Sequence, residues 1–244
     1  MSIDINSDMG ELNNLLADGT YEKLMDHVTS INVACGGHAG DTEMMNVMVA
    51  MAKSKGVKLG AHPGYPDKEN FGREEMEDFD PNALLDTVRD QIESLVDIAS
   101  EHDMELTHVK PHGALYKLAV NNEEISQTIA EAIIDVNSSF KAVGLAGSKM
   151  LTVFDELGLD VISESYVDRM YEADGTLRSR KFDDALITDP EKAASQMSSM
   201  MNGNILAIDG TEIPVKIQSV CVHSDTPNSV DIAAAVRAQI DQSI

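Results

Sequence analysis

Short apolar segments alternate with amphipathic helical segments along the whole chain. Residues 3–9 alternate apolar and polar side chains, which predicts a first β-strand. Further short strands are predicted at 33–35, 57–61, around 107–113, and at 142–145, 161–166 and 219–225. Helices are predicted at 21–28, 43–55 and 125–136, and after Asp80, Ser148, Asp189 and Thr226. Alternation of seven strands with helices favours one α/β domain over residues 1–244.

Turn and capping residues support these boundaries. Asp41 or Thr42 can cap the helix that begins near Glu43, and Gly56 can end it. Asp-Pro pairs at 80–81 and 189–190 are typical helix starts, because proline fits the first helical turn. An Asp-Gly pair inside 204–217 predicts a β-hairpin.

Four of the predicted strands end in a histidine. If these strands are parallel and consecutive, their carboxyl ends meet on one face of the fold. The side chains expected to converge there are His38, His62, His112 and His223. For the His38 junction alone, a glycine turn with a hydrogen-bonded histidine is the alternative interpretation.

Carboxylates and cations follow the same strand ends. Asp8 and Glu11 leave the first strand, where Asp8 can ligate a metal, act as a base or serve as a turn residue. Two long loops, 62–80 and 167–189, have the length of lids or binding loops. The first contains Tyr65 and Arg73, and the second opens with Asp168 and Arg169.

The composition narrows the classes of partner. The chain has 18 Lys plus Arg against 42 Asp plus Glu, a net charge of −24, which argues against binding nucleic acid or an anionic membrane. Basic residues near the predicted site are therefore candidate anion ligands: Arg73, Lys110, Arg169 and Arg180. Without a signal segment or an apolar span, a cytoplasmic location is expected. The two cysteines, Cys35 and Cys221, lie in apolar strands and are expected to be buried thiols.

Six ordered motifs resemble the LamB/YcsF family, which is that of the 5-oxoprolinase A subunit. They are DINSDMGE (4–11), NVACGGHAGD (32–41), GAHPGYPD (60–67), FGR (71–73), VKPHGALY (109–116) and VCVHSDTP (220–227). The resemblance spans nearly the whole chain. It implies an irregular seven-stranded (βα) barrel of the glycoside hydrolase/deacetylase type, in agreement with the predicted strand count.

The resemblance also implies an activity, which is opening of the lactam of 5-oxo-L-proline to L-glutamate at the expense of ATP. For this chemistry we expect catalytic roles for Asp8, Lys110, His112 and Asp168. We expect substrate contacts from Glu11, Tyr65, Arg73, Arg169, His223 and Asp225. The chain contains no phosphate-binding loop of a known type, so ATP with magnesium is expected to be bound largely by two partners, the B and C subunits. Lys110 and the turn at 146–149 are the candidates within this chain.

Two other functional classes compete with this interpretation. One is a stand-alone metal-dependent amide hydrolase or deacetylase, since Asp8, His38 and His62 can hold a divalent metal at the barrel mouth. Histidines that hydrogen-bond in a polar site without metal are an equal alternative. The other class is a non-catalytic binding protein for a small acid. A requirement for ATP and partners separates the oxoprolinase from the hydrolase, and turnover eliminates the binding protein.

Overall fold

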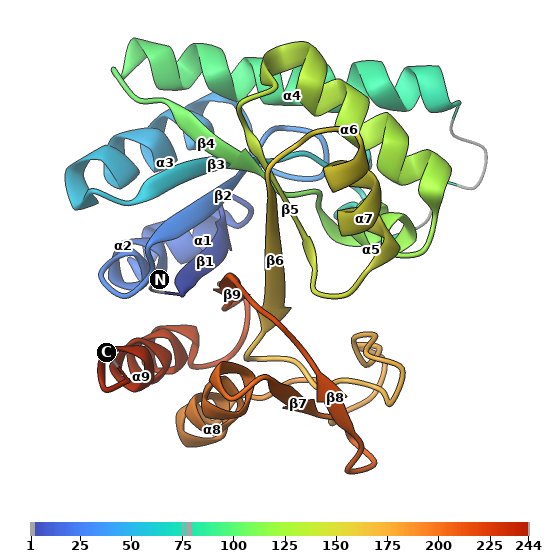
Figure 1. Ribbon diagram of the computed structural model, residues 1–244. Helices are drawn as coiled ribbons and strands as arrows, with labels where there is room; N and C mark the ends of the chain where they lie inside the picture. Colours follow the sequence, from blue (N-terminus) through green and yellow to red (C-terminus); the bar gives the residue numbers. More distant parts are fainter. Residues whose placement is uncertain (1–2, 75, 77–79, 244) are drawn as a thin grey trace.

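Seven parallel strands close into a barrel in the computed structural model, which describes residues 3–74, 76 and 80–243 (Figure 1). β1 pairs with β2 on one side and with β9 on the other, and β6 pairs with β9 to complete the closure. The strands in barrel order are β1 (Asp4–Met9), β2 (Ser30–Ala34), β3 (Lys58–His62), β4 (Leu106–Val109), β5 (Lys141–Leu145), β6 (Val161–Tyr166) and β9 (Ser219–Cys221). The predicted seven-stranded (βα) barrel is therefore confirmed.

Helices cover the outside of the barrel, with α3, α4 and α6 packed side by side (Figure 1). Among the described residues, no helix is long and apolar enough to cross a membrane. The helices are α1 (Asn13–Ala17), α2 (Thr20–Met25), α3 (Thr42–Lys55), α4 (Pro81–Glu101), α5 (Gly113–Ala119), α6 (Glu123–Asn137), α7 (Lys149–Glu156), α8 (Pro190–Met201) and α9 (Ser229–Asp241).

The helix boundaries follow from the capping residues. The Asp41 side chain accepts a hydrogen bond from Met44 N at the start of α3, and Gly56 ends α3 in the left-handed region with φ of 67°. Ser148 caps α7 and Asp189 caps α8 in the same way as Asp41 caps α3. The predicted hairpin is also present, as the antiparallel pair β7 (Asn204–Leu206) and β8 (Glu212–Pro214).

The interior of the barrel is polar, whereas its outer face is apolar. Asn6 Nδ2 donates to Glu164 Oε2 (3.1 Å) and to Ser219 Oγ (2.8 Å), which links β1, β6 and β9 across the lumen. Asn32 Nδ2 donates to Asn6 Oδ1 at 2.8 Å, and His108 contacts Asn32 Oδ1 at 2.8 Å. The residues that alternate with these polar ones along the strands, such as Ile5 and Met9 of β1, belong to the apolar core between the strands and the helices. This arrangement explains the period-two pattern of residues 3–9.

Some predicted boundaries are corrected by the structure. β2 begins at Ser30, three residues before the predicted start, because its polar residues Ser30 and Asn32 are buried and hydrogen-bonded. The short helices α1 and α5 were not predicted, since neither has an amphipathic repeat long enough to recognise. α9 begins at Ser229 rather than near Thr226, after Asn228 in a left-handed conformation. Within the predicted loop 62–80, residues 75 and 77–79 lie outside the described residues.

Candidate active site

A cavity of about 80 Å³ lies at the carboxyl ends of the barrel strands. Its walls come from β1, β3 and β6 and from the segments that follow β1, β3, β4, β6 and β9. Among the predicted site residues, those that line it are Asp8, Glu11, His62, Arg73, Lys110, His112, Arg169, His223 and Asp225. The strand ends thus bring together residues that are up to 217 positions apart in the chain.

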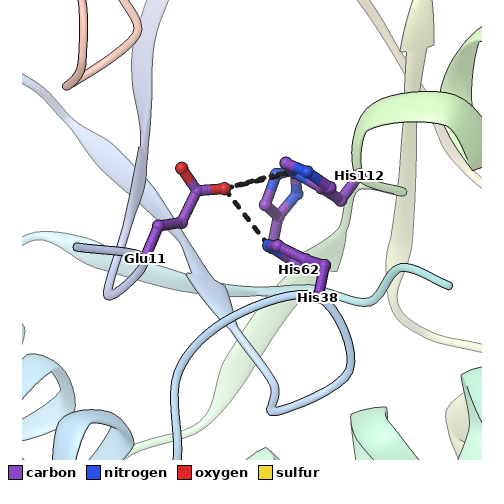
Figure 2. Close-up of side chains that lie close together, drawn as sticks. All are labelled: Glu11, His38, His62 and His112. Carbon is purple, nitrogen blue, oxygen red and sulfur yellow. Dashed lines mark hydrogen bonds and ion pairs between the residues drawn. The ribbon is translucent and has the colours of Figure 1, made fainter. Parts of the chain in front are cut away.

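Three histidines and one glutamate form a compact cluster beside the cavity (Figure 2). Glu11 Oε1 lies 3.1 Å from His112 Nδ1, 3.2 Å from His38 Nε2 and 3.7 Å from His62 Nε2. The rings of His38 and His112 stack with their centroids 3.5 Å apart. Burial lowers the pKa of His38 to about 4 and that of His62 to about 3, so both imidazoles are neutral at pH 7.

The composition of this cluster differs from the predicted metal set of Asp8, His38 and His62. One potential ligand atom from each of Glu11, His38, His62 and His112 lies within 4.8 Å of all the others. Asp8 Oδ2 also approaches His62 Nε2, to 3.6 Å, but the Asp8 carboxylate accepts a hydrogen bond from Asn32 Nδ2 and pairs with the Lys110 ammonium. The residues that could hold a divalent metal are therefore Glu11 and three histidines.

Lys110 lies between two buried carboxylates. Its Nζ is 3.1 Å from Asp8 Oδ1 and 3.0 Å from Glu164 Oε2. Burial would lower the pKa of the Lys110 ammonium, but the Asp8 and Glu164 carboxylates outweigh it and raise that pKa well above its usual value. Burial would likewise raise the pKa of Asp8, yet His62 and Lys110 hold it well below its usual value. The pair is therefore an ammonium and a carboxylate at neutral pH, and only Asp8 can accept a proton.

Asp168 does not line the cavity but holds His223, which does. The Asp168 carboxylate accepts hydrogen bonds from His223 N (2.9 Å), from His223 Nδ1 (3.0 Å) and from Thr226 Oγ1 (2.7 Å). Burial raises the pKa of Asp168, but His223 and Thr226 more than compensate, and the net pKa is lowered. Asp168 thus fixes the orientation of His223, and the ring of His223 stacks on Tyr166.

Three guanidinium groups line the same cavity. Arg73 Nη2 and Arg180 Nη1 both donate to Asp225 Oδ2, at 2.8 and 2.9 Å. Arg169 is 3% exposed, and its Nε has no hydrogen-bond partner among the described residues. A buried donor without a partner is unusual in proteins, so it is a candidate contact for an anionic ligand.

Some site residues lie elsewhere than predicted, and others were missed. Tyr65 is 1% exposed and belongs to the apolar core instead of the cavity wall. Glu164, Tyr116 and Tyr166 were not selected from the sequence, although the two tyrosines line the cavity. A carboxylate in the middle of an otherwise uncharged strand was the available signal for Glu164, which is 0% exposed. Cys35 and Cys221 are free and buried, as predicted.

Comparison with known proteins identifies the family of this chain. The chain is 42% identical over 238 residues to the 5-oxoprolinase A subunit of Chloroflexus aggregans, covering 97% of this chain and 94% of that protein. It is 40% identical to the 5-oxoprolinase A subunit of Pyrococcus furiosus, with 99% and 95% covered. The crystal structure of a lactam utilization protein from Thermus thermophilus superposes with a TM-score of 0.91 at 36% identity, covering 100% of this chain and 97% of that one. The LamB/YcsF family profile matches residues 3–244, and the chain belongs to the LamB/YcsF family.

Proposed function

We propose that this chain is the A subunit of an ATP-dependent 5-oxoprolinase that converts 5-oxo-L-proline to L-glutamate in the cytoplasm. The observation that carries the proposal is the cavity at the barrel mouth, which combines Arg73, Arg169 and Arg180 with the Asp8–Lys110 pair. The relatives named as A subunits of 5-oxoprolinase support the choice of reaction.

The cavity suits the charges of this substrate. 5-Oxoproline carries one carboxylate, and the unpaired Nε of buried Arg169 is a donor for it. In the reaction, the lactam oxygen takes the γ-phosphoryl group of ATP, and ADP leaves. Water adds to the lactam carbon, the ring C–N bond breaks and the nitrogen takes a proton, which gives an acyl phosphate. A second water cleaves this acyl phosphate to L-glutamate and phosphate. We assign to Asp8 the role of accepting the proton of water, and to the Lys110 ammonium the role of offsetting negative charge on oxygen.

The two candidate ATP contacts of this chain are already engaged. Lys110 is enclosed by Asp8 and Glu164, and Lys149 Nζ pairs with Glu123 at 2.6 Å. The turn at 146–149 does not line the cavity, and Ser148 caps α7. We therefore assign most of the ATP–magnesium site to the partner B and C subunits.

Reconstitution tests this function. Purified chain is mixed with the B and C subunits, 5-oxoproline, ATP and magnesium, and glutamate and phosphate are measured while one component at a time is omitted. We expect glutamate and phosphate in equal amounts from the complete mixture only. Arg169→Gln is expected to raise KM for 5-oxoproline, with Arg89→Gln, on α4 outside the cavity, as the control. Full activity of the chain alone with ATP would refute the partner requirement.

A stand-alone metal-dependent amide hydrolase is the second candidate, because Glu11 and three histidines lie together beside the cavity. Release of glutamate by the chain without ATP would support this candidate and reject the oxoprolinase assignment.

A further inference from the structure

We infer that Glu11, His38, His62 and His112, here called the mouth cluster, bind one divalent transition-metal ion. The inference rests on the geometry of these four side chains (Figure 2) and does not depend on which reaction the cavity supports.

Two backbone carbonyl groups fix the tautomers of two histidines. His62 Nδ1 lies 2.7 Å from the Lys110 carbonyl oxygen, and His112 Nε2 lies 2.9 Å from the Phe71 carbonyl oxygen. A carbonyl oxygen can only accept, so both of these ring nitrogens carry the proton and donate. In the neutral form of each ring the other nitrogen, His62 Nε2 or His112 Nδ1, then presents a lone pair.

When both rings are neutral, these two lone pairs face each other with no donor between them. His62 Nε2 and His112 Nδ1 are 3.0 Å apart, and Glu11 Oε1 is 3.1 Å from the same His112 nitrogen. In that state three acceptor atoms converge in a buried place, which is repulsive unless a proton or a metal ion lies among them. Histidines that ligate metals commonly donate their second N–H to a backbone carbonyl, as both rings do here.

The spacing of the acceptors fits a single ion. Ligand atoms about 2.0–2.1 Å from a tetrahedral ion lie roughly 3.3 Å from one another. The contacts of Glu11 Oε1 with the three imidazole nitrogens range from 3.1 to 3.7 Å. His38 Nε2 lies 3.2 Å from Glu11 Oε1. Because the His38 ring stacks parallel to the His112 ring with centroids 3.5 Å apart, the two rings would tilt apart when His38 Nε2 becomes the fourth ligand atom. Three imidazole nitrogens and one carboxylate oxygen favour zinc and the neighbouring transition metals over magnesium or calcium.

The backbone is shaped around the imidazoles. A Cβ atom at Gly64 would lie 2.8 Å from His38 Nδ1, and one at Gly72 would lie 2.6 Å from His38 Cβ. Both glycines belong to the loop after β3, and the absence of a side chain at these two positions leaves room for the His38 ring. Glu11, His62 and His112 also line the cavity, so an ion in the mouth cluster would be accessible to a molecule bound there.

A second group of potential ligands, Asp8, Cys221 and His223, does not provide an equivalent site. The Lys110 ammonium already contacts two of its three members, since Nζ lies 3.1 Å from Asp8 Oδ1 and 3.3 Å from Cys221 Sγ. A metal ion there would displace a buried cation from its partners. The mouth cluster has no such occupant among the described residues.

Metal titration of the full chain tests the inference. Chelator-treated protein is titrated with Zn²⁺ by calorimetry, and the metal content is measured by elemental analysis after gel filtration. We expect one ion per chain and an affinity at least about 100-fold lower for His62→Ala and for Glu11→Gln. His27→Gln, outside the cavity, is the matched control and should bind like the unaltered chain. Circular dichroism establishes that each variant is folded.

Nitrogen-15 NMR of the imidazoles keeps the inference testable if a variant fails to fold. In unaltered protein, zinc should shift the His62 Nε2 and His112 Nδ1 resonances while Nδ1–H of His62 and Nε2–H of His112 persist. Zinc binding that is absent, or equal in the His62→Ala/His112→Ala variant, would overturn the inference. A single proton shared by His62 and His112 in zinc-saturated solution would also overturn it.

Discussion

Lys110 Nζ lies 3.1 Å from Asp8 Oδ1, and both side chains are buried at the mouth of the barrel. The same nitrogen reaches Glu164 Oε2 at 3.0 Å, so one ammonium balances two buried carboxylates. Removing one member of a buried ion pair is costly because the partner is left charged in a medium of low polarity. Lys110 is therefore both a structural and a chemical part of the site.

Lys110→Met should lower the free energy of unfolding by about 3–5 kcal/mol, because Asp8 and Glu164 lose their common cation. Urea denaturation measures this change, and glutamate release by the complete mixture should fall in parallel. Lys149→Met is the matched control: its Nζ pairs with Glu123 at the surface, with both side chains at least half exposed. The control should cost less than about 1 kcal/mol. Equal losses of unfolding free energy in the two variants would mean that burial of Lys110 does not increase the contribution of its ion pairs to stability.

Asp168→Asn should reduce kcat/KM of the complete mixture by about 10- to 100-fold, because the charged acceptor that orients His223 is lost. His223→Gln should give a similar loss, and the double variant should be little worse than either single variant, since both changes remove one interaction. Thr226→Val removes a different donor to Asp168 and should have a smaller effect. Steady-state kinetics measures these losses, and additive effects would contradict a shared role.

The convergence of the histidines could be predicted from the sequence, because parallel strands bring their carboxyl ends to one face whatever the details of packing. The identity of the carboxylate beside the histidines, Glu11 instead of Asp8, could not be predicted in this way. Asp8 lies within β1, and its carboxylate is hydrogen-bonded to Asn32 and paired with Lys110. Gly10 then turns the chain, with φ of 76°, before Glu11. Which of two carboxylates three positions apart faces the histidines depends on the local backbone path, and the periodicity of the sequence does not determine that path.

The buried position of Tyr65 and the role of Glu164 could not be predicted from the sequence for a different reason. Glu164 depends on a contact across the barrel lumen, and Tyr65 depends on packing in the apolar core. Tyr65 packs in the apolar core, and Glu164 Oε2 accepts from Asn6 of β1. A loop tyrosine and an isolated strand glutamate are each compatible with an exposed position when only their neighbours in sequence are considered.

Gly72→Ala should destabilise the protein more than Gly147→Ala, although both glycines have positive φ, 61° and 78°. Either substitution places alanine in the left-handed region at a cost of about 1–2 kcal/mol. At Gly147 nothing lies within 4 Å of the added Cβ, whereas at Gly72 it would lie 2.6 Å from His38 Cβ. An additional loss of about 1–3 kcal/mol is expected there. Thermal unfolding compares the two variants, and only Gly72→Ala should also weaken zinc binding.

Asp225 offers a pH-dependent test, because it joins the two long loops through Arg73 and Arg180. Burial would raise the pKa of the Asp225 carboxyl, but Arg180 and Arg73 outweigh it, and the pKa lies below its ordinary value of 3.8. A carboxyl whose pKa is lowered by folding stabilises the folded state above the unfolded-state pKa. That contribution is lost as the pH falls through the folded-state pKa.

Asp225→Asn should therefore lower the free energy of unfolding by about 1–3 kcal/mol at pH 7. The difference from the unaltered chain should stay constant down to about pH 5 and shrink below 3.8, where the carboxyl becomes protonated in the unfolded state while the folded state still holds it ionised. Urea denaturation between pH 7 and pH 3 measures this difference in the free energy of unfolding. Asp97→Asn, on the exposed face of α4, should change the free energy by less than about 0.5 kcal/mol. A difference for Asp225→Asn that is unchanged at pH 3 would show that the two arginines do not lower this pKa, and that the variant acts through packing alone.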